Sequence, residues 1–188
     1  MVLTYSQKFA MGKSMPNFSL PATNGQTYSP DNFKDKKAIV VVFTCNHCPY
    51  AKLTKPKLHN LDKLYKDKGV QFLAINSNES KNYPEDSFAK MKEEHYNYPF
   101  LYLRDESQEV AKAFGAVCTP DIFVYDHEQK LAYRGQLDDE RPDDNLPLSQ
   151  NEPGYAKDIK AALDKLVAGQ PPDKNQKPSM GCSIKWKE

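Results

Sequence analysis

Residues 38–53 read AIVVVFTCNHCPYAKL, and this stretch decides the fold. The apolar run 38–43 has the continuous hydrophobicity of a strand buried on both faces, as in the centre of an α/β sheet. From Cys48 onward apolar residues recur at spacings of mostly three or four, which is typical of a helix, and Pro49 suits its first position. Cys45 and Cys48 are therefore predicted to lie where a buried strand passes into a helix.

The rest of the chain alternates predicted strands and helices. The Asn24-Gly25 turn favours a hairpin of short strands near the N-terminus. Further strands are predicted at 70–76, 100–103, 121–125 and 130–137, and helices from Pro84, around 107–114 and in the region of 155–166. Alternation of this kind implies an α/β sheet with helices on both sides.

The length of 188 residues fits one domain with a good-sized core, which we place at residues 1–168, followed by a tail at 169–188 that opens with GQPPDKNQKP. The formal net charge of +1 gives no reason to expect binding to nucleic acid or to acidic membranes. The longest apolar run is too short to cross a bilayer, and the N-terminus lacks the apolar core of a secretory signal. We therefore expect a cytoplasmic protein with free thiols.

A cysteine pair at a strand-to-helix junction favours electron exchange. The unpaired N–H groups of the first helical turn stabilise a thiolate, so we expect a lowered pKa for Cys45. Cys48, one turn later, can then attack a mixed disulfide formed at Cys45. A cationic His47 would stabilise the Cys45 thiolate further, whereas the alternative is a solvated loop histidine. Such chemistry needs a protein or small-molecule disulfide as substrate and an external thiol as electron donor, but no bound cofactor.

A metal site is the main alternative for the cysteines. A single CxxC is a weak zinc signal, because structural zinc sites usually need a second pair of ligands. Cys118 and Cys182 are single and distant in the sequence. We expect no metal, and a non-enzymatic metal- or partner-binding module that uses all four cysteines remains as a third hypothesis.

The motif FTCNHCP, followed about 70 residues later by Thr119-Pro120, resembles the thioredoxin superfamily. The N-terminal extension MPNFSLPATNGQTYSPDNFKDKKAIVVVF resembles its redoxin branch, which includes the alkyl hydroperoxide reductase/thiol-specific antioxidant proteins and the TlpA/ResA-like thiol–disulfide oxidoreductases. The resemblance covers roughly residues 13–168. It implies a thioredoxin-like fold, with a central mixed β-sheet flanked by helices, an N-terminal β-hairpin extension and a C-terminal tail.

The same resemblance implies roles for individual residues. Cys45 resembles the attacking cysteine and Cys48 the resolving one. Pro120 resembles the cis-proline that packs against the CxxC, and this isomer would leave the backbone of Thr119 open to pair with a substrate strand. The first hypothesis is therefore a thiol–disulfide oxidoreductase.

Several departures from the family pattern qualify this reading. Peroxiredoxins carry the signature P-x-x-x-T/S-x-x-C, which fits neither cysteine here, so a thiol-dependent, peroxiredoxin-like peroxidase is the second hypothesis. An arginine near the site would help a peroxidase, but Arg134 and Arg141 are expected on solvated surface. No acid precedes the CxxC on its strand, and Glu79, after the next strand, is the candidate to replace it.

The other two cysteines form a possible auxiliary pair. Cys118 precedes the proline by two residues, so the fold would bring it near the CxxC. The segment GCSIKW carries a glycine and an apolar pair at strand spacing, so the tail could fold back, dock beside the site and bring Cys182 against Cys118. The two thiols would then form a second disulfide that relays electrons, or the docked segment would act as a regulated cap. The alternative is a Cys118 that acts as a small buried hydrophobe and an incidental Cys182.

Overall fold

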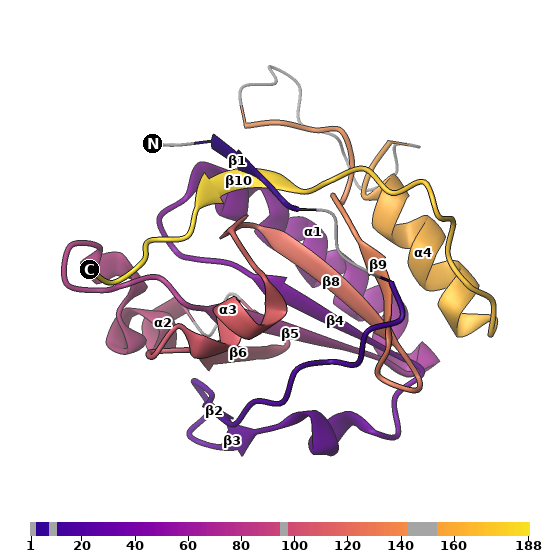
Figure 1. Cartoon of the computed structure of the whole chain (residues 1–188), viewed down its shortest axis with the longest axis horizontal. Coiled ribbons are helices and arrows are strands. Elements are labelled where there is room, and N and C mark those ends of the chain that lie inside the picture. Colours follow the sequence, from indigo (N-terminus) through magenta and orange to yellow (C-terminus); the bar gives the residue numbers. More distant parts are fainter. Residues whose placement is uncertain (1–2, 8–10, 95–97, 143–153) are drawn as a thin grey trace.

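The computed structural model describes residues 3–7, 11–94, 98–142 and 154–188. Its main sheet has five strands in the order β6-β5-β4-β8-β9 (Figure 1). The strands of this sheet are β4 (Ala38–Phe43), β5 (Val70–Asn76), β6 (Leu101–Arg104), β8 (Asp121–Asp126) and β9 (Leu131–Arg134). The central strand β4 pairs in parallel with β5 and antiparallel with β8, so the sheet is mixed, as predicted.

Helices cover both faces of this sheet (Figure 1). They are α1 (Pro49–Tyr65), α2 (Phe88–Glu94), α3 (Glu109–Phe114) and α4 (Lys157–Val167). Side chains of a strand alternate between its two faces, and β4 shows this directly. Val40 and Val42 pack in the core that includes Leu58 of α1 and Leu163 of α4. Ile39, Val41 and Phe43 of β4 face the opposite way and pack with α3 and the N-terminal extension.

The N-terminal extension forms the predicted hairpin, from β2 (Leu20–Pro21) and β3 (Thr27–Tyr28), followed by a 3-10 turn at Pro30–Phe33. Two other elements differ from expectation. β9 ends at Arg134 rather than at 137. The helix expected from Pro84 begins only at Phe88, because Pro84–Asp86 form a separate 3-10 turn. This turn matters for the site, since it buries the Asp86 side chain.

A second, three-stranded sheet was missed by the sequence analysis. It has the order β1-β10-β7, formed by β1 (Leu3–Tyr5), β10 (Met180–Ser183) and β7 (Cys118–Thr119). The pairing is antiparallel throughout, and it places β1 and β7 on the two sides of β10 (Figure 1). The segment GCSIKW shows strand spacing, but β1 and β7 have too few residues for a period-two pattern to be read, so the sheet that they form with β10 was not predicted. Among the described residues, no helix has the length and apolar character needed to cross a membrane.

The packing of α1 against β4 predicts that alanine substitutions on the buried and exposed faces of this helix change the free energy of unfolding by different amounts. Leu58→Ala removes a fully buried side chain and is expected to lower the free energy of unfolding by about 2–5 kcal/mol. Leu64→Ala on the same helix removes a side chain that is 46% exposed and is expected to change it by no more than about 0.5 kcal/mol. Denaturant titration of both variants measures this; equal losses would contradict the packing described.

Candidate active site

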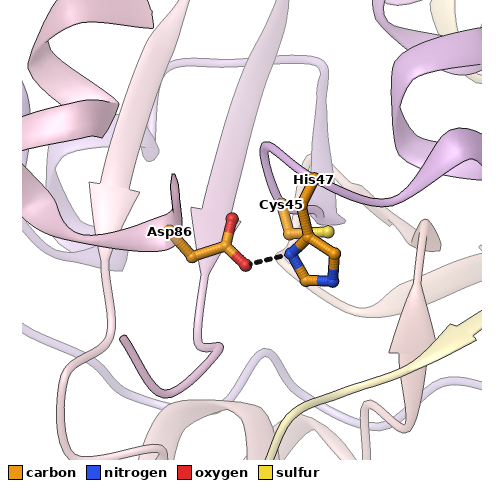
Figure 2. A group of neighbouring side chains, drawn as sticks. All are labelled: Cys45, His47 and Asp86. Carbon is orange, nitrogen blue, oxygen red and sulfur yellow. Dashed lines mark hydrogen bonds and ion pairs between the residues drawn. The ribbon is translucent and has the colours of Figure 1, made fainter. Parts of the chain in front are cut away.

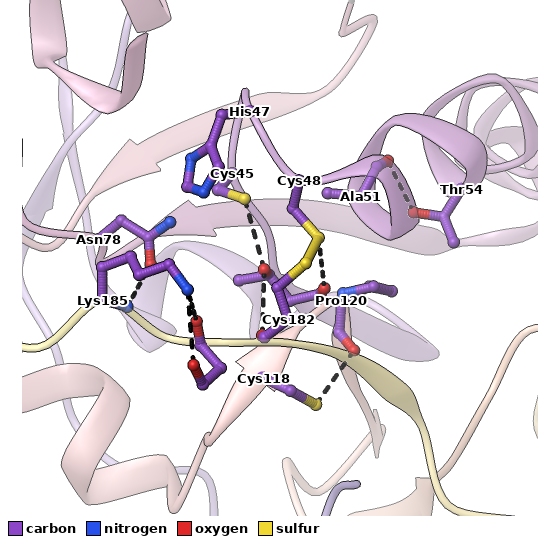
Figure 3. Close-up of a disulfide and its surroundings, with 12 residues drawn as sticks. Cys45, His47, Cys48, Ala51, Thr54, Asn78, Cys118, Pro120, Cys182 and Lys185 are labelled. Atoms are coloured by element: carbon purple, nitrogen blue, oxygen red, sulfur yellow. Dashed lines mark hydrogen bonds between the residues drawn. A yellow bond between two sulfur atoms is a disulfide. The ribbon is translucent and has the colours of Figure 1, made fainter. Parts of the chain in front are cut away.

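The CxxC lies at the junction between β4 and α1. Cys48 is the residue that caps the N-terminus of α1, and Pro49 is its first helical residue. Both cysteine side chains are buried, Cys45 with 2% and Cys48 with 0% of its surface exposed. Cys48 is disulfide-bonded to Cys182 of β10, and Cys45 is a free thiol (Figure 3).

The free thiol of Cys45 is held by its neighbours. Its Sγ lies 3.3 Å from Oγ1 of Thr119, whose hydroxyl donates to the carbonyl oxygen of Cys182 at 3.5 Å. A hydroxyl has one hydrogen, so in this arrangement the Cys45 thiol donates to Thr119. Burial of the thiol, with a smaller contribution from the charge of Asp86, raises the pKa of Cys45 to about 11.

The expectation of a lowered pKa for Cys45 was therefore wrong for this state of the protein. The backbone N–H groups of His47 and Cys48 do favour the thiolate, as the strand-to-helix geometry predicted. Burial in a low-dielectric surrounding outweighs them, because it penalises the charged form. The sequence analysis expected the tail to dock beside the site, but its expectation for the pKa of Cys45 did not include the burial that results.

A buried carboxylate, Asp86, stands beside the CxxC. Its Oδ2 accepts a hydrogen bond from His47 Nδ1 at 2.6 Å (Figure 2). Its side chain also accepts hydrogen bonds from the backbone N–H of Asn46 and from the amides of Asn76 and Asn78. Burial by itself would raise the pKa of Asp86, but the hydrogen bonds from His47 and Asn78 hold it below its ordinary value. Asp86 is therefore an ionised carboxylate in the interior.

The Asp86 carboxylate determines which ring nitrogen of His47 carries a hydrogen. An ionised carboxylate only accepts hydrogen bonds, so Nδ1 of His47 carries a hydrogen and Nε2 is the atom left to exchange a proton. The ring also stacks on Tyr83, with centroids 5.0 Å apart and an interplanar angle of 20°. A ring nitrogen of His47, a carboxylate oxygen of Asp86 and Sγ of Cys45 all lie within 4.8 Å of one another. The alternative of a solvated loop histidine is wrong, since the His47 side chain is only 19% exposed.

The acid of the site is Asp86 and not Glu79. The carboxylate of Glu79 turns back on its own loop, where it accepts hydrogen bonds from the backbone N–H groups of Lys81 and Asn82. Asp86 escaped the sequence analysis because its partner His47 lies 39 residues away in the chain. The available signal was the pair of asparagines, Asn76 and Asn78, at the end of a buried strand, since buried amides require polar partners.

The Thr119–Pro120 peptide bond is cis, the isomer that the resemblance implied. The backbone of Thr119 is not open, however, because β10 pairs with β7 in the register Cys182 to Thr119. Where a substrate strand was expected, the structure has the C-terminal strand of the same chain. Gly181 makes this approach possible, since a Cβ atom there would lie 2.1 Å from the Thr119 carbonyl oxygen.

The expected contact between Cys182 and Cys118 was wrong. Cys182 is bonded to Cys48, whereas the Cys118 thiol lies 3.5 Å from the carbonyl oxygen of Pro120 (Figure 3). Neighbouring residues of a strand point to opposite faces, and Thr119 already points toward Cys45, so Cys118 points away. Cys118 is fully buried, and burial raises the pKa of its thiol.

Arg134, expected on solvated surface, is instead buried against Asp121 at 2.9 Å and over the ring of Phe123. Its guanidinium also donates to the carbonyl oxygen of Gly115 at 2.8 Å. The charge of Arg134 is therefore compensated by a buried carboxylate.

The four cysteines do not form one cluster of metal ligands. Among the described residues, the group of three or more potential ligands consists of Cys45, His47 and Asp86, and it includes neither Cys118 nor Cys182. Both carboxylate oxygens of Asp86 already accept hydrogen bonds. The arrangement fits a thiol served by a proton-transferring histidine and carboxylate better than a metal site made of four cysteines.

Comparison with known proteins gives the following matches. The family model described as Redoxin matches residues 10–150. The thiol-disulfide oxidoreductase ResA of Bacillus thuringiensis is 27% identical over 128 residues, which are 68% of this chain and 70% of that protein. The chloroplastic peroxiredoxin Q of Triticum aestivum is 27% identical over 108 residues, 57% of this chain and 47% of that protein.

Solved structures agree with the fold. An uncharacterized conserved protein from Geobacillus kaustophilus is 46% identical with a TM-score of 0.92, covering 100% of this chain and 97% of its own. The thioredoxin domain of a thiol-disulfide oxidoreductase from Bacteroides vulgatus has a TM-score of 0.57 at 21% identity, over 68% of this chain and 89% of its own. The predicted thioredoxin-like α/β fold is thus confirmed.

The contacts of Asp86 predict a change in thiol reactivity. Asp86→Asn removes the negative charge that contributes to the raised pKa of Cys45, so this pKa is expected to fall below about 11. Only the thiolate is alkylated, so a fall of about one unit gives roughly tenfold faster reaction at a fixed pH below the pKa. The measurement is the rate of iodoacetamide labelling of Cys45 in the oxidised protein, followed by peptide mass.

Glu85→Gln is the matched control, because Glu85 is adjacent to Asp86 but exposed. It is expected to leave the labelling rate as in the wild type. Labelling of Asp86→Asn at or below the wild-type rate would contradict the electrostatic role given to Asp86.

Proposed function

Since this chain belongs to the redoxin family, we propose that it is a thiol–disulfide oxidoreductase in which Cys45 attacks a disulfide substrate and Cys48 resolves the mixed disulfide. The observation that carries the proposal is the free thiol of Cys45 beside a Cys48 that is itself oxidised. Cys48 thus takes part in a disulfide at this site, while a second thiol remains beside it to act as nucleophile.

The proposed reaction has two exchanges. The Cys45 thiolate attacks one sulfur of the substrate disulfide, the S–S bond breaks, and the first half of the substrate leaves as a thiol. The Cys48 thiolate then attacks the Cys45 sulfur and releases the second half. The substrate gains two electrons and two protons, and the two cysteines become a disulfide that an external thiol must reduce.

Neighbouring side chains support these steps. Deprotonating Cys45 requires a group that takes its proton, and Nε2 of His47 is free for this because Asp86 occupies Nδ1. Asp86 acts as a positioning residue through His47. The Thr119 hydroxyl, 3.3 Å from Sγ of Cys45, can donate to the sulfur when the thiolate forms or leaves.

The division of roles between the cysteines gives a direct prediction. With insulin as disulfide substrate and dithiothreitol as electron donor, Cys45→Ser is expected to reduce turnover to the rate of dithiothreitol alone, because no nucleophile remains. Cys48→Ser is expected to accumulate a covalent Cys45–substrate disulfide, seen as a mass increase that reducing agent reverses.

Cys118→Ala is the control in the same assay, since the Cys118 thiol faces away from Cys45 and contacts Pro120. It is expected to keep wild-type turnover. Full turnover by Cys45→Ser, or trapping at a different cysteine in Cys48→Ser, would show that the roles are assigned wrongly.

A second function, thiol-dependent peroxide reduction, is favoured by the similarity to peroxiredoxin Q. In that reaction Cys45 would be oxidised to a sulfenic acid that a second cysteine resolves. The P-x-x-x-T/S-x-x-C signature is absent, and Arg134 is bound to Asp121. We therefore expect slow reaction of the reduced protein with hydrogen peroxide, measured by stopped-flow loss of peroxide; a fast second-order reaction that Cys45→Ser abolishes would reverse the order of the two proposals.

A further inference from the structure

The disulfide between Cys48 and Cys182 links the resolving position of the CxxC to the C-terminal strand, 134 residues away in the chain. Cys182 and the two CxxC cysteines pack together in one buried cluster with Ala51. Cys48 therefore has two cysteines beside it, of which Cys182 is the bonded one and Cys45 is free.

We propose that Cys182 is a third catalytic thiol. After substrate reduction it displaces Cys45 from the Cys45–Cys48 disulfide, and the oxidised protein then contains the disulfide Cys48–Cys182. This inference rests on the proposed disulfide-exchange function and adds a step to it. In this state Cys45 is again a free thiol, as the structure shows.

The added step is an exchange without net oxidation or reduction. The Cys182 thiolate attacks Sγ of Cys48, the Cys45–Cys48 bond breaks, and Cys45 leaves and takes up the proton that Cys182 lost. One disulfide is present before and after. An external dithiol closes the cycle by reducing Cys48–Cys182, which returns three thiols to the protein and converts the donor to its disulfide.

The surroundings hold Cys45 as a neutral thiol once it has left Cys48, because burial raises its pKa to about 11. Its Sγ lies 3.3 Å from the Thr119 hydroxyl, and the backbone N–H groups of His47 and Cys48 also favour its charged form. Once protonated, the thiol is stabilised by burial. The exchange thus ends with Cys45 as a protonated, buried thiol, which is the form that this site favours.

The tail is held in place by contacts that do not involve the disulfide. On one side of Cys182, the Ser179 hydroxyl donates to the carbonyl oxygen of Gly135 at 2.7 Å. On the other side, the backbone N–H of Ile184 donates to the carbonyl oxygen of Val117 at 3.0 Å, and the Ile184 side chain is buried.

Further along the tail, the backbone N–H of Lys185 donates to the Asn78 side chain, and Gln108 donates to the Lys185 carbonyl oxygen. Contacts on both sides of Cys182 hold it at a fixed place beside Cys48. A cysteine held in this way reacts at a high effective concentration.

Gly181 is a second feature of the sequence that the docking of β10 requires. A side chain there would collide with the Thr119 backbone, with Cβ 2.1 Å from its carbonyl oxygen and 2.6 Å from its carbonyl carbon. Only a residue without a Cβ atom admits β10 at this distance. Gly181→Val therefore offers a variant that keeps every cysteine but displaces Cys182 from Cys48.

The first measurement identifies the disulfide. Reduced wild-type protein is oxidised by one equivalent of bis(2-hydroxyethyl) disulfide, quenched in acid, alkylated and digested, and its bridged peptides are quantified by mass spectrometry. Cys48–Cys182 is expected to predominate over Cys45–Cys48 in the wild type. Cys182→Ser and Gly181→Val are both expected to give Cys45–Cys48 instead.

The second measurement is the midpoint potential. An additional stable disulfide partner favours the oxidised form, so removing it raises the potential. A preference of about tenfold for Cys48–Cys182 corresponds to a rise of about 30 mV in Cys182→Ser, with a similar rise in Gly181→Val. Lys174→Ala, an exposed substitution in the same tail, is expected to keep the wild-type potential.

The outcomes separate this inference from the function on which it rests. Wild-type protein that reduces insulin but contains only Cys45–Cys48 when oxidised, with no change of potential in Cys182→Ser, overturns the role of Cys182 and leaves the disulfide-exchange function intact. Wild-type protein that fails to reduce insulin overturns both, whichever bridge is found.

Discussion

The contact between β10 and the Thr119–Pro120 segment is the constraint on which the rest of the site depends. It joins the last strand of the chain to the edge of the cis peptide, at a distance that only glycine at position 181 permits. It places Cys182 beside Cys48 and buries Cys45. Without this strand, the CxxC would lie at an open strand-to-helix junction, and its thiol chemistry would be that of an exposed helix N-terminus.

Burial beneath β10 and hydrogen bonding have opposite effects on the ionisation of the acidic groups in the site. Burial favours the neutral form of every acid, and it keeps Cys45 protonated in the oxidised protein. Asp86 is buried as well, yet its hydrogen bonds from His47 and Asn78 keep it ionised. The difference lies in the number of donors around each group. The result is a neutral nucleophile beside a fixed carboxylate–histidine pair, which is an arrangement suited to moving a proton.

Much of the fold could be predicted from the sequence, because the two central parallel strands are continuous apolar runs and the helix after the CxxC has clear periodicity. The strand 38–43 and the strand 70–76 were placed at their observed bounds. The site was only partly predictable. The cysteine pair and the cis-proline are visible as motifs, whereas the partner of Cys182 depends on which face of β7 each side chain occupies.

Asp86 illustrates the same limit in electrostatic terms. As part of the sequence PED it has the composition of a solvated first helical turn, and nothing local indicates that it is buried. Its role arises from the convergence of His47, Asn76 and Asn78 from two other segments. The raised pKa of Cys45 likewise follows from tertiary burial, which overrode the local preference of a helix N-terminus for a thiolate.

The most direct test of the account is amide hydrogen–deuterium exchange of the segment 180–184 in the oxidised protein. The Ile184 amide donates to the Val117 carbonyl oxygen and lies two residues after the disulfide-bonded Cys182. We predict that it exchanges at least about 100-fold more slowly than in an unstructured chain, and that Gly181→Val removes this protection. Exchange at the unstructured rate in the wild type would contradict the docked strand and the site built beneath it.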